Sequence, residues 1–155
     1  MAEIPPVRPR PTGLARVFVR APVLLYRLGL GRLVAKHTLL LVTTGRRSGR
    51  PRVVPLDYQR EGDTLYLIAE GGGRSPWFRN LTANPEVEVR VGSRRMKGVA
   101  TPLTDAKEKA HVLRLFVQRS ERLAERYYGI PRGASDQDLV ALAPQRAVVA
   151  VRPRE

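Results

Sequence analysis

Short segments with β-strand character follow one another along this sequence, and most are joined by tight turns rather than by helices. We predict six strands, at residues 37–44, 52–60, 64–69, 87–91, 94–103 and 147–151. Strands joined so closely pair antiparallel, because a parallel crossover needs a dozen or more residues. Six strands in a small chain also need closure or helical cover to protect their edges. We therefore predict an α+β fold, a small antiparallel barrel with surrounding helices.

Helices are expected before, between and after these strands. We predict a helical region over 13–35, a short helix from Ser75-Pro76 to Asn84, and a long helix that Thr104 caps and that runs to Tyr127. A further short helix is expected over 136–142. Residues 1–11 are rich in proline and indicate a flexible tail, so we expect a single domain over 12–155.

The charge balance narrows the range of ligands. The 155 residues contain 28 Lys and Arg against 14 Asp and Glu, which gives a net charge of +14. Residues 1–56 hold eleven bases and one acid, so a net +10 falls in this part. A surplus of arginine attracts phosphates and carboxylates, because the guanidinium group binds them with two hydrogen bonds at once. A genome rich in G and C would produce the same arginine bias without a functional reason.

The counts of cysteine and histidine exclude several kinds of site. There is no cysteine, which excludes a disulfide framework, a thiolate metal site and a cysteine nucleophile. His37 and His111 fit no metal-ligand spacing, so we expect no metal site. Any redox chemistry then needs a bound cofactor.

The N-terminal part lacks the apolar core of a signal peptide. The apolar stretch 21–42 contains Arg27, Arg32 and Lys36, which makes it a poor transmembrane helix. We expect a cytoplasmic protein. The stretch fits a helix of the protein's own core, and contact of a basic amphipathic helix with a membrane surface stays open as the alternative.

Three segments could carry chemistry. Residues 43–52 combine two glycines, a serine hydroxyl and four arginines between two strands, which suits an anion-binding turn. Residues 69–81 place three glycines before a capped helix with Trp77 and Asn80, which suits an anion or a planar ring. Tyr127 and Tyr128 offer hydroxyl groups that could donate a proton or orient a substrate carbonyl or nitro group. Each segment also has a structural alternative: a solvated turn, a tryptophan in the core and an ordinary helix end.

The sequence resembles the deazaflavin-dependent nitroreductase family, split β-barrel proteins related to FMN-binding oxidoreductases. The resemblance lies in LLLVTTGRRSGRPRVVP (39–55), in residues 65–72 and in WFRNLTANP (77–85), and it covers about residues 20–103. Family members use coenzyme F420, an 8-hydroxy-5-deazaflavin. The resemblance thus implies a split barrel and an enzyme that passes hydride from the reduced coenzyme to a quinone, an activated alkene or a nitro compound.

The resemblance also implies roles for individual residues. The phosphate or the carboxylate tail of the coenzyme would lie on Arg46, Arg47, Ser48 and Arg52. The deazaflavin ring would lie along Val53, Val54, Pro55 and Leu56, with Ala69, Glu70 and Gly71 at its other edge. The pocket would be completed by Trp77, Phe78 and Asn80. Tyr127 or Tyr128 would be the proton donor or the group that orients the acceptor.

Two alternatives stay open from the sequence. One is a reductase of the same fold that uses FMN, which also carries a phosphate. The other is a non-catalytic protein that binds nucleic acid or an anionic membrane through its net charge, although no recognition motif for nucleic acid is present. We expect a small-molecule electron acceptor as partner, no specific nucleic acid, and a monomer or a homodimer.

Overall fold

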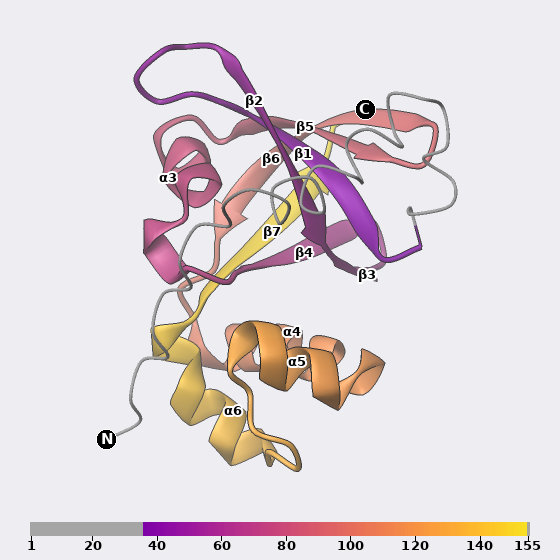
Figure 1. Cartoon of the computed structure of the whole chain (residues 1–155), viewed down its shortest axis with the longest axis vertical. Coiled ribbons are helices and arrows are strands. Elements are labelled where there is room, and N and C mark those ends of the chain that lie inside the picture. Colours follow the sequence, from indigo (N-terminus) through magenta and orange to yellow (C-terminus); the bar gives the residue numbers. More distant parts are fainter. Residues whose placement is uncertain (1–35, 155) are drawn as a thin grey trace, which may run out of the picture.

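Seven strands form one curled antiparallel sheet in residues 36–154, the part of the chain that the computed structural model describes (Figure 1). The strands are β1 Thr38–Thr44, β2 Pro51–Asp57, β3 Gln59–Glu61, β4 Thr64–Ala69, β5 Glu86–Val91, β6 Arg94–Pro102 and β7 Ala147–Pro153. Their order across the sheet is β2-β1-β5-β6-β7-β4-β3, and every neighbouring pair is antiparallel. The α+β split barrel expected from the sequence is confirmed.

The expected strand over 52–60 is two strands, which is why the sheet has seven strands and not six. The chain leaves the ladder at Tyr58, so β2 pairs with β1 and β3 pairs with β4. Within the described residues β2 has β1 as its ladder partner and forms one edge of the sheet. Pro55 lies in this strand opposite Leu40. An edge position suits it, because proline has no backbone N–H to donate to a second neighbour.

The inside of the curl is an apolar core that helix α3, Pro76–Ala83, helps to close. Successive strand residues point to opposite faces, so Leu67 of β4 and Val149 of β7 face this core. Trp77 and Leu81 of α3 pack into the same core. The helix begins at Pro76, after Ser75 as expected, but the Ser75 side chain makes no capping hydrogen bond. A one-turn 3-10 helix, Gly72–Arg74, leads into it.

The other face of β4 and β7 is covered by three helices, α4 Ala106–Arg119, α5 Glu121–Tyr128 and α6 Asp136–Leu142, which lie together below the sheet in Figure 1. Ile68 and Val148 point from the strands into this second core. A short 3-10 helix, Ala143–Gln145, joins α6 to β7.

The single long helix expected from Thr104 to Tyr127 is wrong on two points. The N-cap is Asp105, whose carboxylate accepts the Glu108 backbone N–H at 2.9 Å. The helix also breaks at Ser120, which ends α4 and starts α5. The Ser120 hydroxyl accepts the Leu123 backbone N–H at 3.3 Å, which replaces a helical partner that this amide lacks at the start of α5.

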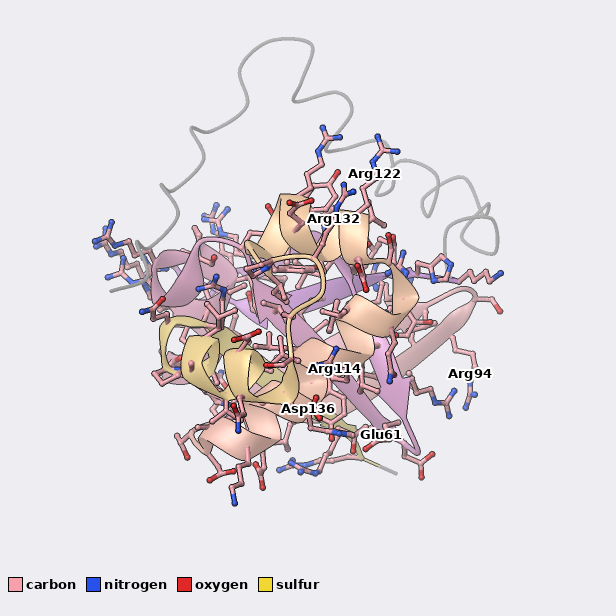
Figure 2. The ribbon with its side chains drawn as sticks, turned by 90° about the horizontal axis from the view of Figure 1, so that it is seen from below. Glu61, Arg94, Arg114, Arg122, Arg132 and Asp136 are labelled. Atoms are coloured by element: carbon pink, nitrogen blue, oxygen red, sulfur yellow. The ribbon has the colours of Figure 1, made fainter. Side chains whose placement is uncertain are left out.

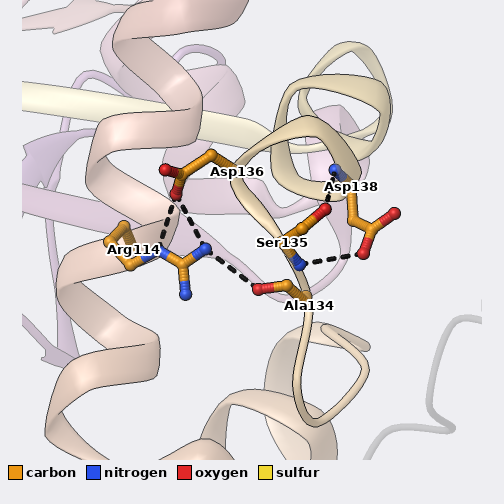
Figure 3. Close-up of polar contacts among 5 residues, drawn as sticks. All are labelled: Arg114, Ala134, Ser135, Asp136 and Asp138. Carbon is orange, nitrogen blue, oxygen red and sulfur yellow. Dashed lines mark hydrogen bonds and ion pairs between the residues drawn. The ribbon is translucent and has the colours of Figure 1, made fainter.

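Helix α6 is fixed to α4 by Arg114 (Figure 2). Its guanidinium group donates to Asp136 Oδ1 at 2.8 and 3.1 Å and to the Ala134 carbonyl at 2.9 Å (Figure 3). Ser135 and Asp138 form a reciprocal capping box at the start of α6. The expected helix over 136–142 is therefore confirmed, and its acids lie in its first turn as their sequence positions indicated.

Arg146 connects the last strand to the helical layer. Its side chain is only 7% exposed, and it donates from Nε to the Tyr128 carbonyl at 2.8 Å and from Nη2 to the Gly129 carbonyl at 3.2 Å. These carbonyls end α5, where Gly129 takes a left-handed conformation with φ of 63°. A cation suits this place, because the end of a helix carries partial negative charge.

The predicted tail over 1–11 and the predicted helical region over 13–35 lie outside the described residues. Within residues 36–154, no helix has the length and apolar character needed to cross a bilayer. The cytoplasmic location and the single domain over 12–155 stay predictions from the sequence.

We predict that Arg146→Met lowers the free energy of unfolding by about 2–4 kcal/mol, because it removes the donor of one buried and one partly buried carbonyl. Denaturant unfolding followed by circular dichroism measures the loss. Arg152→Met is the matched control, since Arg152 lies on β7, which begins directly after Arg146, and is exposed. Equal losses in the two variants would contradict the role given to Arg146.

Candidate functional site

A pocket of about 360 Å³ lies between the β1–β2 turn, strand β2 and helix α3. It is lined by Thr43, Gly45, Arg46, Arg47, Ser48, Arg52, Val53, Val54, Pro76, Trp77 and Asn80. The structure thus brings together two of the three segments that the sequence analysis selected, although the turn and the helix are separated by about 30 residues of chain.

The turn between β1 and β2 is held in one shape by its own hydrogen bonds. Gly45 N–H donates to the Arg50 carbonyl at 2.8 Å, Gly49 N–H donates to the Gly45 carbonyl at 2.8 Å, and Arg50 N–H donates to the Ser48 hydroxyl at 3.2 Å. Gly49 has φ of 68°, which favours glycine. A Cβ on Gly45 would lie 2.6 Å from Ser48 Oγ and 3.1 Å from the Arg50 carbonyl oxygen. The absence of this atom lets the turn close.

Asn80 fixes the turn to helix α3. Its side chain is 4% exposed, and its Oδ1 accepts from the Arg46 backbone N–H at 3.2 Å and from Arg46 Nη1 at 3.0 Å. Its Nδ2 donates to Thr43 Oγ1 at 3.2 Å. One amide therefore joins the end of β1, the arginine turn and α3.

Positive charge gathers around this turn without a counter-charge. Within residues 36–154, no ion pair is formed by Arg46, Arg47, Arg52 or the neighbouring Arg79. Desolvation, followed by the charges of Arg79 and Arg47, lowers the pKa of Arg46 from its ordinary value. Such a cluster suits an anion, because a phosphate or carboxylate would supply the missing counter-charge.

The other wall of the pocket is apolar. Val53 is 43% exposed, Val54 is partly buried, and Trp77 is 8% exposed with its ring edge-on to Phe78 at 6.2 Å between ring centroids. The pocket thus offers charged donors at one end and flat apolar surface beside them. This combination fits an anionic cofactor with a planar ring, so the coenzyme implied by the sequence matches the residues present.

More residues were predicted for the site from the sequence than line the pocket. The predicted residues on the pocket wall are Arg46, Arg47, Ser48, Arg52, Val53, Val54, Trp77 and Asn80. The pocket wall does not include Pro55, Leu56, Ala69, Glu70, Gly71 or Phe78. Leu56 and Phe78 pack against the barrel core, Ala69 lies within it, and Glu70 is exposed.

Three pocket residues were not assigned from the sequence, namely Thr43, Gly45 and Pro76. Thr43 and Gly45 belong to the TTGRRSG stretch already singled out, and Pro76 precedes Trp77. Their position in these motifs was the only feature of the sequence that could have indicated a place in the pocket. Their roles in shaping the turn and the helix start depend on contacts that the sequence does not display.

The structure places Tyr127 and Tyr128 in the helical layer and not on the pocket wall. Tyr128 is 8% exposed, and its ring meets Phe116 edge-on at 5.2 Å between ring centroids. Burial, followed by the negative charges of Asp57 and Glu70, raises the pKa of the Tyr128 phenol far above its ordinary value. Tyr127 is partly buried, with the Arg126 guanidinium 5.7 Å from its ring centroid.

The charges that act on the Tyr128 phenol come from two residues outside the helical layer. Asp57 ends β2, whose earlier residues line the pocket, and Arg119 at the end of α4 lies 3.5 Å from the Asp57 carboxylate. Glu70 follows β4 and precedes the segment that leads into α3. Tyr128 thus responds to the charge of the strand that forms part of the pocket, although it does not line the pocket itself.

Comparison with known proteins gives concordant results. The sequence model of the family described as F420H(2)-dependent quinone reductase matches residues 19–133. A curated protein named F420H(2)-dependent quinone reductase, from Mycobacterium tuberculosis (strain ATCC 25618 / H37Rv), is 46% identical over 72 residues. This match covers 44% of the present chain and 48% of the relative, so the chain spans about half the length of this curated relative.

Two solved structures share the fold. One, described as an F420-H2 dependent reductase (FDR-A), has a TM-score of 0.56 and 27% identity and covers 76% of this chain and 95% of that one. Another, described as a domain-swapped dimer, has a TM-score of 0.56 and 25% identity and covers 84% of this chain and 99% of that one.

We predict that the buried Tyr128 phenol makes stability fall in alkaline solution. The pKa of Tyr128 is raised in the folded state above its ordinary value of 10.0. The folded chain therefore keeps this proton where the unfolded chain loses it. The contribution of the Tyr128 phenol to the free energy of unfolding is therefore constant below pH 10. Above pH 10 it declines by up to about 1.4 kcal/mol per pH unit.

Urea unfolding of wild type and Tyr128→Phe at a series of pH values measures this slope. The phenylalanine variant is expected to lose less stability above pH 10, whereas Tyr127→Phe, the control, should follow the wild type. Parallel curves for Tyr128→Phe and wild type would show that the phenol does not carry this dependence.

Proposed function

The chain belongs to the F420H(2)-dependent quinone reductase family, and from this premise we propose that it transfers hydride from reduced coenzyme F420 to a small organic acceptor, a quinone in the first place. The observation that carries the proposal is a pocket in which arginines without an ion-pair partner in residues 36–154 adjoin apolar side chains. Activated alkenes and nitro compounds are the other acceptors to be tested. Family membership disfavours the alternative of a non-catalytic basic binding protein.

We assign the pocket residues to the two parts of the coenzyme. Arg46, Arg47, Ser48 and Arg52 would bind its phosphate or carboxylate groups, because they supply charged and neutral donors from one rigid turn. The ring would lie against Val53, Val54 and Trp77. The remaining residues assigned from the resemblance, Pro55, Leu56, Ala69, Glu70, Gly71 and Phe78, stay predictions that depend on the ring extending beyond the pocket.

The bound coenzyme supplies hydride chemistry that no side chain of this protein could perform. The chain has to hold the anionic groups, present one ring face to the acceptor and exclude water from the other. The fixed turn meets the first requirement, and the wall of Val53, Val54 and Trp77 meets the second and third. No strongly acidic or basic catalyst is needed beyond a source of one proton.

We propose that Tyr128 orients the acceptor rather than releasing its own proton. A tyrosine phenol is protonated at neutral pH, and burial and the charges of two acids raise the pKa of Tyr128 further, so its hydroxyl can donate a hydrogen bond to a carbonyl oxygen. Tyr127, which is less buried, is the alternative donor.

FMN remains the secondary cofactor, since its phosphate would suit the same turn. The similar structure described as a domain-swapped dimer supports a homodimer as the assembly to test. Contact with a membrane stays a prediction from the sequence, without support from the described residues.

We predict that Arg46→Ala combined with Arg47→Ala weakens binding of coenzyme F420 by about 2–4 kcal/mol, because two charge-assisted contacts are lost. Isothermal titration with F420 and, separately, with FMN measures the affinities. Arg94→Ala with Arg95→Ala is the matched control. It removes two adjacent arginines from β6, and Figure 2 shows Arg94 projecting outward.

Two results would contradict the proposal. If the wild-type protein binds FMN but not F420 at micromolar concentration, FMN and not F420 is its cofactor. Equal affinity of wild type and the Arg46/Arg47 variant would place the anion elsewhere on the chain.

We further predict that Tyr128→Phe lowers kcat for quinone reduction about tenfold while the F420 affinity remains unchanged. Stopped-flow oxidation of the reduced coenzyme in the presence of a water-soluble quinone measures the step. Tyr127→Phe is the parallel variant. If Tyr127→Phe lowers kcat and Tyr128→Phe does not, the orienting role passes to Tyr127.

A further inference from the structure

The hydrogen-bond partner of Arg46 is a neutral amide, although a carboxylate would fit in the same place. The Asn80 amide oxygen accepts from both the backbone N–H and the Nη1 of Arg46, at 3.2 and 3.0 Å. An aspartate at position 80 could accept the same two hydrogen bonds. It could also keep the contact to Thr43, since a threonine hydroxyl both donates and accepts.

The neutral Asn80 side chain lies among positively charged neighbours. Arg79 stands next to Asn80 in α3, and the charges of Arg79 and Arg47 act on Arg46. No carboxylate pairs with any of these three arginines in residues 36–154. Like charges at short range repel each other, so an acid at position 80 would offset this repulsion by pairing with Arg46. The protein instead carries an amide at this buried position.

We infer that Asn80 is a positioning residue that fixes Arg46 without neutralising it, so that the turn selects ligands with two or more negative charges. The inference rests on the proposed function, in which this turn binds the coenzyme, and it names the charge class that the turn accepts. A monovalent anion leaves part of the repulsion among Arg46, Arg47 and Arg79 in place, whereas a polyvalent anion removes it.

If Asn80 has this role, an acid at position 80 should change the stability of the fold and the affinity for anions in opposite directions. An acid at position 80 would pair with Arg46 inside the protein and occupy the charge that the ligand needs. The folded protein should therefore become more stable while its affinity for polyanions falls. A residue with a purely structural role would not separate the two effects in this way.

The test compares Asn80→Asp with Asn84→Asp, which adds the same charge four residues later, at the C-cap of the same helix. Asn84 caps the end of α3, accepts the Glu86 backbone N–H at 3.2 Å and is not part of the pocket. Thermal unfolding measures stability. Isothermal titration measures binding of inorganic pyrophosphate, of chloride as the monovalent probe, and of coenzyme F420.

We expect Asn80→Asp to unfold at the wild-type temperature or above and to bind pyrophosphate and F420 about tenfold more weakly. Asn84→Asp should bind both as the wild type does. Arg79→Glu is the second variant, because Arg79 is exposed and its replacement leaves the Asn80 hydrogen bonds intact. It should also weaken pyrophosphate binding severalfold.

Unchanged pyrophosphate and F420 affinities in Asn80→Asp and Arg79→Glu would overturn the inference, and so would equal binding of chloride and pyrophosphate to wild type. If Asn80→Asp fails to fold, the pyrophosphate affinity of Arg79→Glu decides whether the inference holds. Failure of the proposed function looks different: wild type would bind pyrophosphate, and Asn80→Asp would bind it weakly, while neither bound F420.

Discussion

One antiparallel sheet has to bury both of its faces, and the position of the pocket follows from how it does so. The curl encloses the inner face around Leu67 and Val149, while helices α4 to α6 cover the outer face around Ile68 and Val148. The edge strand β2 lies outside this helical cover, so that Val53 is exposed and Val54 only partly buried. An apolar edge strand is a liability in a free protein, and here it forms one wall of the pocket.

Helix α3 turns that edge into a site. It closes the inner core with Trp77 and Leu81, and its buried polar residue, Asn80, hydrogen-bonds to the arginine turn and to the end of β1. The geometry of the anion site is thus coupled to the packing of the barrel. A ligand bound at the turn would meet donors that are already in place, so little ordering entropy would be lost on binding.

Much of this architecture could be predicted from the sequence, because strand alternation, tight turns and capping residues act locally. The alternation of Val87, Val89 and Val91 and the acids after Ser135 predicted β5 and α6 correctly. The break at Ser120 could not be predicted, because the helical periodicity continues through it and the cap depends on a hydroxyl contact. The partners of Asn80 were likewise invisible, since Arg46 and Thr43 lie more than 30 residues away.

The place of β7 in the sheet has a consequence for how the protein is made. Strands β3 and β4 join the rest of the sheet through β7, which lies between β4 and β6 although it comes last among the strands. During synthesis the ribosome therefore releases two incomplete sheets, β2-β1-β5-β6 and β4-β3, that cannot be united until residue 153 has emerged. The unpaired edges of β6 and β4 are exposed until then. During this interval they could pair with the strands of other chains, so the nascent chain is prone to aggregation.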